Sequence, residues 1–247
     1  MSTEVLTRPL TVTADKALRP AVYRHEDKYL INRAEAELLK RRLQVFLNRD
    51  KNAPDGGYFI RSLYFDDAKL SAYNDKLSGY NERAKYRIRF YNMDEGYIVL
   101  EKKEKRAGMT HKTSGVITKE CCERLIARDG AGAERLCPIP IVKELSALIS
   151  ASGMRPAVLV DYDRVPFTFA VSNVRVTLDI GVRTCPFNTQ DIFSRCLPCV
   201  PALPDGTAVL EVKYNSFLPM NVSAILEGVP KAHMAISKYV LCLNVVN

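Results

Sequence analysis

The segment NERAKYRIRFYN, residues 81–92, constrains the fold of this chain more strongly than any other segment. At the two-residue period of a β-strand, one face of the segment is basic and the other is apolar. The basic face carries Arg83, Lys85, Arg87 and Arg89, and the apolar face carries Tyr86, Ile88 and Phe90. An ordinary strand buries its apolar face and leaves its charges in water. The other strands decide whether this basic face is open or enclosed.

Four more extended segments, 23–29, 98–105, 174–180 and 208–214, alternate in a similar way. Their polar faces carry more basic than acidic residues. These residues are Arg24, Glu26, Lys28, Glu101, Lys103, Lys105, Arg175, Thr177, Asp179, Glu211 and Lys213. Because like charges on neighbouring strands repel, an open face built from these rows is unfavourable. A sheet that curls around them forms a basic, water-filled tunnel instead, and about eight strands are needed to close one.

The helical segments indicate how the apolar face is covered. Apolar residues recur at helical spacing in 32–47, 119–150 and 223–243, and Asn32 is a suitable N-cap for the first of these helices. Since no alternating βαβ pattern occurs, antiparallel pairing is favoured. We therefore predict an α+β fold: an eight-stranded antiparallel β tunnel with a polar, basic lumen and helices packed outside.

The charge of the chain predicts an anionic partner. Its 247 residues include 36 Lys and Arg against 28 Asp and Glu, a net charge of +8. This charge suits nucleic acid, a phosphorylated small molecule or an acidic membrane surface. No apolar run reaches the roughly 18 residues of a membrane helix, and the N-terminal segment lacks a signal-peptide core. We expect a cytoplasmic protein with a flexible arm at 1–21 and one domain at 22–247.

The cysteines and histidines show no metal-site pattern. The seven cysteines are odd in number and irregularly spaced, so we expect reduced thiols. Cys196 and Cys199 have a zinc-like spacing, but no second pair stands at the distance of a zinc ribbon. His25, His111 and His233 show no ligand spacing.

The mixture of basic and acidic side chains suits a chain of phosphates. Arg offers forked donors to phosphate oxygens and Lys a compact charge, so rows of both can hold consecutive phosphoryl groups with no base or sugar. The interspersed carboxylates suit a divalent cation, Mg²⁺ or Mn²⁺, that bridges carboxylate and phosphate oxygens. Nucleic-acid binding is disfavoured, because single-strand grooves place aromatics among the basic residues, whereas most aromatics here lie on the opposite faces.

Eight motifs resemble, in their order along the chain, those of the VTC domain. This domain is the polyphosphate polymerase module of the vacuolar transporter chaperone family, in the triphosphate tunnel metalloenzyme superfamily. The motifs are RHEDKYLI, SLYFDD, KLSGYNERAKYRIRFY, LEKKEK, RPAVLVDYDRVPF, VRVTLDI, VLEVKYN and SKY, and they span about Tyr23 to Val240. The resemblance implies a tunnel in which basic residues hold ATP and a growing polyphosphate chain. A carboxylate-bound metal would assist transfer of the γ-phosphate.

The resemblance also implies roles for single residues. The phosphate-binding set corresponds to Lys28, Arg87, Arg89, Lys103, Lys112, Arg164, Arg175 and Lys213. The candidate catalytic residues are Arg87, Arg89 and Lys238, the last resembling a late lysine near the transfer site. The metal candidates are Glu211, which resembles the metal-binding glutamate, and Glu26, Glu101 and Asp179.

Departures from the family pattern keep other functions open. Fungal relatives carry an N-terminal SPX sensor and a membrane anchor, which this sequence does not contain, so translocation of a product is not implied. Arg24 stands where the hydrolase branch has the first glutamate of E-x-E-x-K, which argues against a two-metal triphosphatase. The alternatives are hydrolysis of inorganic or nucleoside triphosphate, and a non-catalytic polyphosphate or nucleotide sensor. The oligomeric state is not predicted.

Overall fold

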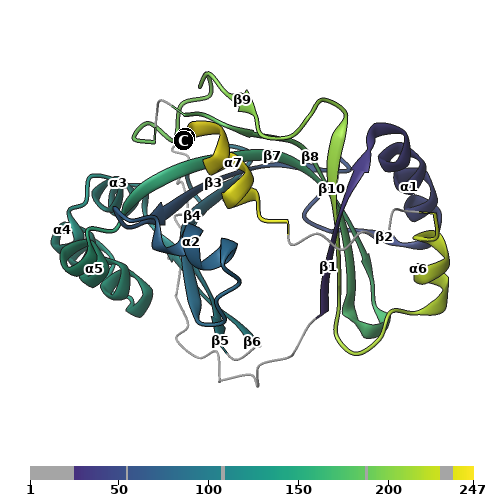
Figure 1. Ribbon diagram of the computed structural model, residues 1–247, viewed down its shortest axis with the longest axis horizontal. Coiled ribbons are helices and arrows are strands. Elements are labelled where there is room, and N and C mark those ends of the chain that lie inside the picture. Colours follow the sequence, from purple (N-terminus) through teal and green to yellow (C-terminus); the bar gives the residue numbers. More distant parts are fainter. Residues whose placement is uncertain (1–24, 54, 107–108, 187–188, 229–235) are drawn as a thin grey trace, which may run out of the picture.

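The computed structural model describes residues 25–53, 55–106, 109–186, 189–228 and 236–247. The predicted arm at 1–21 lies outside these residues, as do Arg24 and His233. Within them, the chain forms one curved sheet of ten strands with seven α-helices around it (Figure 1). None of the described helices is long and apolar enough to cross a membrane.

The main path of the sheet has the strand order β1-β10-β8-β7-β3-β4-β5-β6, and all neighbours are antiparallel. These strands are β1 (His25–Asn32), β3 (Tyr58–Asp66), β4 (Arg83–Tyr91), β5 (Ile98–Arg106), β6 (Met109–Ile117), β7 (Arg155–Phe169), β8 (Val174–Thr184) and β10 (Thr207–Tyr214). The short strands β2 (Asn48–Arg49) and β9 (Val200–Pro201) pair with β7 and β8, and a 3₁₀ turn (Val171–Asn173) joins β7 to β8. The predicted α+β class and antiparallel pairing are confirmed.

The predicted closure of the sheet into a barrel is wrong. β1 and β6 are the edges of the sheet and do not pair with each other in the described part of the chain, so the sheet is an open arch in Figure 1. Pairing would bring the two edges to about 4.8 Å and would narrow the space that the basic side chains occupy. Side chains bridge the walls instead, since Nζ of Lys103 on β5 lies 3.0 Å from Oε2 of Glu26 on β1.

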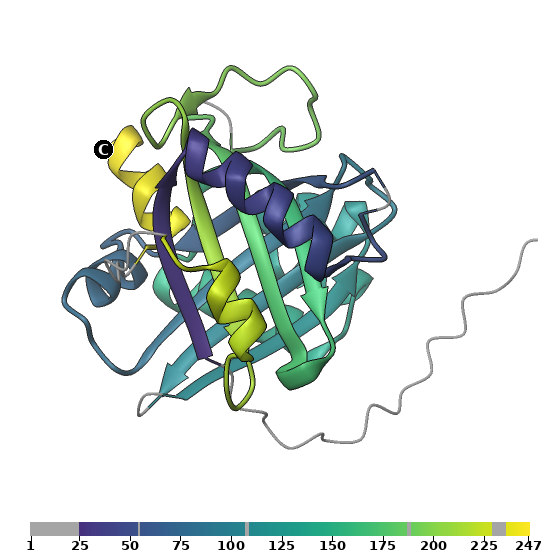
Figure 2. The ribbon, with the colours of Figure 1, turned by 90° about the vertical axis from the view of Figure 1, so that its right-hand side faces the viewer.

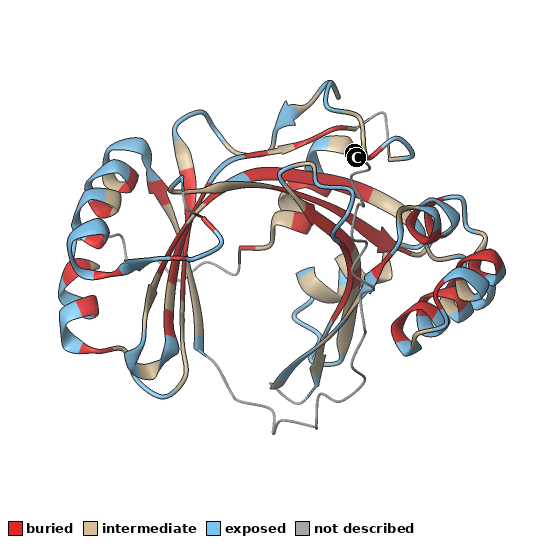
Figure 3. Cartoon of the chain, turned by 180° about the vertical axis from the view of Figure 1, so that it is seen from behind, coloured by how far each residue is buried: buried red, intermediate tan, exposed pale blue. Residues whose placement is uncertain are grey.

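Three helices cover the convex face of the arch over β3 to β6: α3 (Lys119–Ile126), α4 (Gly130–Leu136) and α5 (Pro140–Ser152). Tyr86, Ile88 and Phe90 are buried beneath them. In Figure 3, buried residues follow the strands and the helix sides that face the sheet. The apolar face of segment 81–92 therefore points outward to helices, and its basic face points into the arch, as predicted.

Helices α1 (Arg33–Phe46) and α6 (Met220–Ile225) cover the convex face at the other end of the sheet (Figure 2). Asn32 caps α1 as predicted. Its Oδ1 accepts the N–H of Glu35 at 2.9 Å, and the Glu35 carboxylate accepts the N–H of Asn32 at 2.7 Å. The two bonds satisfy backbone donors that the first turn of a helix leaves unpaired.

The C-terminal helix, predicted to pack outside, lies on the concave face instead. α7 (Lys238–Val246) buries Tyr239 and Leu243 against inward-pointing apolar residues such as Ile60 and Val160. This end of the concave face is apolar, so exposing it to water would be unfavourable. The short helix α2 (Ser71–Leu77) lies beside α7. This placement brings the first residue of α7, Lys238, into the arch.

The expectation of reduced thiols is wrong for two cysteines. Cys185 and Cys199 form a disulfide across a sequence separation of 14, so Cys199 is not paired with Cys196 of the zinc-like motif. The loop that they close folds back over the convex face, where it is fastened by Arg61 of β3. The Arg61 guanidinium donates to the backbone oxygens of Ile192 at 2.8 Å and Ser194 at 2.6 Å. This folding back, which cysteine spacing does not reveal, brings the two thiols together.

Candidate active site

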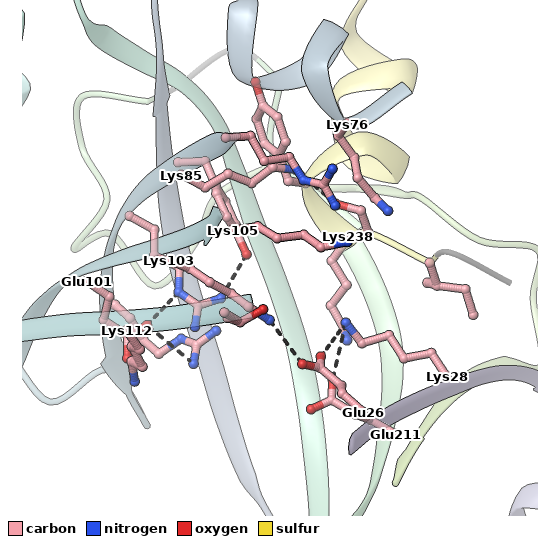
Figure 4. Close-up of a pocket in the computed structure, with 18 of the residues that line it drawn as sticks. Glu26, Lys28, Lys76, Lys85, Glu101, Lys103, Lys105, Lys112, Glu211 and Lys238 are labelled. Atoms are coloured by element: carbon pink, nitrogen blue, oxygen red, sulfur yellow. Dashed lines mark hydrogen bonds and ion pairs between the residues drawn. The ribbon is translucent and has the colours of Figure 1, made fainter. Parts of the chain in front are cut away.

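The concave face of the sheet, together with α2 and α7, encloses a cavity of about 660 Å³ (Figure 4). Twelve lysine and arginine side chains and four carboxylates line it. The described residues that line the cavity thus carry a surplus of eight positive charges, so the basicity of the described chain is concentrated here. The lining cations are Lys28, Lys76, Arg83, Lys85, Arg87, Arg89, Lys103, Lys105, Lys112, Arg164, Lys213 and Lys238, and the carboxylates are Glu26, Glu101, Glu104 and Glu211.

Glu101 of β5 is the centre of one ion-pair network. Its Oε2 lies 2.5 Å from Nε of Arg87 and 3.7 Å from Nη1 of Arg89, and its Oε1 contacts Lys112. Burial would raise the pKa of Glu101, but the three cations outweigh burial and lower the pKa to about 2. Strand register explains the closest of the arginine contacts, because Arg87 stands opposite Glu101.

Hydroxyl groups hold the two arginines of this network in place. Arg87 donates from Nη1 to the Tyr64 hydroxyl at 2.9 Å. Arg89 donates from Nε to the Ser62 hydroxyl at 3.0 Å and from Nη2 to the Tyr162 hydroxyl at 3.2 Å. These hydroxyls were not among the predicted site residues. The signal that identifies Ser62 and Tyr64 is their register opposite Arg89 and Arg87, which becomes known only once the strands are paired.

Glu26 of β1 and Glu211 of β10 form a second network on the opposite wall. Lys28 Nζ lies 2.6 Å from Oε1 of Glu26 and 3.7 Å from Oε2 of Glu211, and Lys213 also contacts both carboxylates. Burial raises the pKa of each carboxyl, but Lys213 and Lys28 outweigh burial. The pKa of Glu26 falls to about 2, and that of Glu211 falls well below its usual value. Both groups are therefore ionised at neutral pH.

Asp179 of β8 lies beneath two lining cations and is fully buried. Arg164 donates to it twice, from Nε at 2.6 Å and from Nη2 at 2.7 Å, and Lys238 Nζ lies 2.5 Å from its Oδ2. Burial raises the pKa of Asp179, but Lys238 and Arg164 outweigh burial, so the pKa lies below its usual value. Because Asp179 is fully buried and does not line the cavity, the arrangement favours a positioning role for Asp179 over metal binding.

Arg175 also lies outside the cavity lining. It shares the inward-facing row of β8 with Asp179, but it reaches toward one end of the arch. Its Nη2 lies 2.9 Å from Oδ2 of Asp50 and 2.9 Å from the hydroxyl of Tyr58. The structure thus brings every other member of the predicted phosphate-binding set to the cavity, together with Lys238, and leaves Arg175 apart.

The lining cations fall into two groups. Eight of them contact at least one of Glu26, Glu101, Asp179 and Glu211, and we call these twelve residues together the paired region. Its cations are Lys28, Arg87, Arg89, Lys103, Lys112, Arg164, Lys213 and Lys238. The other four, which we call the unpaired cluster, form no ion pair with a carboxylate of the described chain: Lys76, Arg83, Lys85 and Lys105. In Figure 4, Lys76 and Lys85 lie toward the helices, away from Glu26 and Glu211.

None of the four was predicted as a site residue. Strand alternation places Arg83, Lys85 and Lys105 in the inward-facing rows of β4 and β5, but the resemblance to the VTC domain assigned them no role. Lys76 gave no such signal, because it lies on α2 and reaches the cavity only through the tertiary fold.

Three tyrosines line the cavity, and each ring already has a cation over it. Arg87 lies 5.7 Å from the ring centroid of Tyr64, Lys238 lies 4.8 Å from that of Tyr162, and Lys85 lies 4.6 Å from that of Tyr239. These contacts stabilise the cations. They also occupy the aromatic faces on which a nucleobase would stack.

Two of the predicted metal candidates, Glu26 and Glu211, contact the same lysine, Lys28. Oε1 of Glu26 and Oε2 of Glu211 lie 2.6 and 3.7 Å from the same Lys28 Nζ, so they are no more than 6.3 Å apart, the sum of these distances. Carboxylate oxygens suit Mg²⁺ or Mn²⁺, and both side chains line the cavity, where phosphate oxygens could complete the coordination. The donor set therefore fits a divalent ion at Glu26 and Glu211. Glu101 belongs to the network on the other wall.

These features define a class of protein: an α+β domain whose antiparallel sheet arches over a basic cavity with acidic residues inside it. The model of one family, the VTC domain, matches residues 23–247. The chain therefore belongs to the VTC domain family. No match was found among curated proteins.

Solved structures with a similar arrangement have low sequence identity to this chain. A Hippeastrum protein with a dominant triphosphatase activity is 16% identical, with 89% of this chain and 94% of that chain covered and a TM-score of 0.49. The PH1819 protein of Pyrococcus horikoshii OT3 is 14% identical, with 90% and 99% covered and a TM-score of 0.48. A Bacillus halodurans protein is 14% identical, with 85% and 90% covered and a TM-score of 0.46.

Proposed function

We propose that this chain is a metal-dependent polyphosphate polymerase, which transfers the γ-phosphoryl group of ATP to the end of a polyphosphate chain. The observation that carries the proposal is the lining of the cavity: twelve cations and four carboxylates face one concave space. Membership of the VTC domain family supports it, because the resemblance of the motifs implies the same reaction.

Charge complementarity supports a phosphate ligand. Arg87 and Arg89 are held by Glu101, Tyr64 and Ser62, so their orientation is set before a ligand arrives. Preorganised cations stabilise the charge on a transferring phosphoryl group without a cost of reorganisation. Lys238, held by Asp179, adds a compact charge from α7. We assign Arg87, Arg89 and Lys238 to the transferring phosphoryl group.

The metal site is proposed at Glu211 and Glu26. A bound Mg²⁺ or Mn²⁺ would supply charge neutralisation on the phosphate oxygens during transfer. Lys28 and Lys213 contact both carboxylates and keep them ionised, as the lowered pKa values indicate. The same two lysines can contact phosphate oxygens from the other side.

The reaction that we propose needs no strong base. An oxygen of the terminal acceptor phosphate is already ionised near neutral pH. It attacks Pγ while the bond from Pγ to the β–γ bridging oxygen breaks, and ADP leaves with that oxygen. Attack by water would require a proton acceptor, and Glu26 and Glu101, with pKa values of about 2, are weak bases. This difference favours phosphate over water as the acceptor.

Incubating the purified protein with ATP and Mn²⁺ or Mg²⁺ tests the proposal. We expect ADP and an acid-labile polymer, and we expect Glu211→Gln to reduce polymer formation by about 100-fold or more. Glu37→Gln, an exposed change on α1, is the matched control and keeps full activity.

The products decide between the proposal and its alternatives. Free phosphate without polymer would replace it with triphosphate hydrolysis. Binding of ATP and polyphosphate that survives removal of divalent metal, with no turnover, would replace it with a sensor. An active, folded Glu211→Gln variant would contradict the assigned metal site.

A further inference from the structure

The unpaired cluster is unusual because its cations are partly buried without counter-ions. Lys76, Arg83, Lys85 and Lys105 are half-buried and line the cavity. In the described chain, none of them forms an ion pair with a carboxylate. A partly buried charge is normally paired, because loss of hydration costs free energy that a counter-ion offsets. The described part of the chain does not supply this counter-ion.

Strand register places like charges opposite each other in this part of the sheet. Between β4 and β5, Arg83 stands opposite Lys105 and Lys85 opposite Lys103. Directly opposed like charges destabilise an antiparallel pair. One step further along, Arg87 stands opposite Glu101, and the charges are of opposite sign. The sheet therefore changes from repulsive to attractive pairs within one row.

Lys85 illustrates the consequence for a single amine. Its Nζ lies 3.4 Å from the Ser237 hydroxyl and 4.6 Å from the centroid of the Tyr239 ring. Burial, and then the nearby Lys76 and Arg83, lower the pKa of Lys85 to about 7. Lys28 on β1 acts in the same direction as these cations, and Asp66 at the end of β3 opposes them. The pKa of Lys76 is lowered as well, by burial and by Arg83.

We propose that the unpaired cluster is a separate phosphate subsite, which binds the interior phosphates of a long polyphosphate chain while the chain end lies in the paired region. The identity of the ligand rests on the proposed function. Interior phosphates carry one negative charge each and take no part in the reaction, so they require cations and no metal. A cluster without carboxylates meets this requirement.

A phosphate chain fits the cluster better than a nucleotide does. The ring of Tyr239, which lies at this part of the cavity, is occupied by Lys85, so no open aromatic face is offered for base stacking. Both regions line one continuous cavity, so a linear polyanion can occupy them together. On this proposal, a short ligand is held in the paired region, and a longer chain extends to the cluster as well.

Binding measured at several ligand lengths tests the subsite. The ligands are ATP, tripolyphosphate and long polyphosphate, without divalent metal, and the variant is Lys76→Gln combined with Lys85→Gln. We expect about tenfold weaker binding of long polyphosphate, which corresponds to about 1.4 kcal/mol, and less than about a twofold change for ATP and tripolyphosphate. The slope of log affinity against log salt should fall by about 1 to 2 for the long chain. Lys69→Gln, an exposed change just before α2, should leave all three affinities unchanged.

Proton uptake gives a second readout that does not depend on removing a charge. At about pH 8, Lys85 is largely neutral in the free protein, and a bound polyanion should raise its pKa. Calorimetry in buffers of different ionisation enthalpy should therefore detect uptake of roughly one proton with long polyphosphate. Lys85→Arg should retain the affinity and abolish the uptake, because guanidinium stays protonated.

These outcomes are independent of turnover. Equal weakening of tripolyphosphate and long polyphosphate would overturn the subsite, and so would an undiminished uptake of protons in Lys85→Arg. If no polymer is made but the length-dependent loss is observed, the proposed reaction fails and the subsite stands. If polymer is made and the cluster variants bind long chains normally, the subsite fails and the reaction stands.

Discussion

The paired region and the unpaired cluster share one cavity but handle charge in opposite ways. In the paired region, each cation contacts a carboxylate, and Glu101 alone meets Arg87, Arg89 and Lys112. In the unpaired cluster, like charges stand opposite each other, and Lys85 has lost much of its affinity for a proton. Each cation of the paired region thus has a carboxylate contact without a ligand, and in the described chain no cation of the unpaired cluster has one.

The two regions are suited to different tasks: the paired region provides a fixed geometry, and the unpaired cluster provides affinity for an anion. Paired cations are held in fixed positions, which suits the orientation of a reacting group. Unpaired cations destabilise the free protein. An anion that relieves their repulsion restores this lost stability, and the recovered free energy adds to the binding affinity. Natural proteins accept such losses of stability at functional sites.

The largest expected effect comes from unpairing the deepest carboxylate of the paired region. Asp179→Asn would leave Arg164 and Lys238 partly buried without their counter-ion. Removing one partner of a buried ion pair typically costs about 3–5 kcal/mol, so we expect the free energy of unfolding to fall by roughly that amount. Urea denaturation measures the change.

Asp205→Asn, at an exposed position in the turn before β10, is the control and should alter the stability by less than about 0.5 kcal/mol. If Asp179→Asn is as stable as the unchanged protein, the ion pairs of the paired region do not stabilise the free protein, and the two regions do not differ as described.

Lowering the pH is expected to have a smaller effect on the free energy of unfolding. The folded-state pKa of Glu101 is about 2, against 4.5 for an ordinary glutamate. Glu101 contributes fully to the free energy of unfolding above pH 4.5, its pKa in the unfolded chain. This contribution is lost as the pH falls from 4.5 to about 2. The side chain is only 5% exposed, so a shift of this size corresponds to about 3 kcal/mol.

Unfolding free energies measured across this pH range should fall less steeply for Glu101→Gln than for the unchanged protein. An identical pH dependence in the two proteins would show that Glu101 is not held ionised by its three cations. Glu37→Gln should reproduce the curve of the unchanged protein.

The smallest effect on the free energy of unfolding is expected in the unpaired cluster, where removing a charge should stabilise the protein. Because the pKa of Lys85 is lowered, the unfolded chain binds more protons between pH 7 and 10.5, and stability rises with pH across this window. Lys85→Gln should therefore stabilise the protein by about 1–2 kcal/mol below pH 7. The gain should disappear toward pH 10. Thermal unfolding at both pH values measures it, and a destabilised variant at low pH would remove the contrast between the two regions.

Much of the fold was predictable because strand alternation is a local property. The rows of Arg87 and Arg89 on one face, with Ile88 and Phe90 on the other, indicated a curved sheet with a basic interior. The cap at Asn32 was equally local. Closure of the sheet was not predictable in this way, since it depends on whether β1 and β6 meet, and these edges lie far apart in the sequence.

The candidate site was predicted less completely than the fold. Most of the predicted phosphate-binding residues line the cavity, but Arg175 does not, and Lys76 was missed because it comes from a helix. Their functional roles stay predictions. The disulfide between Cys185 and Cys199 was missed for a related reason, because a loop must fold back before the two thiols meet.

Which side chains face inward follows from the local sequence, because the two-residue period of a strand sends alternate residues to opposite faces whatever their partners. Which of the inward cations meet a carboxylate follows from the tertiary fold. Coulomb energy depends on distances between groups on different strands and helices, and those distances exist only after the sheet has curved and α7 has packed inside it.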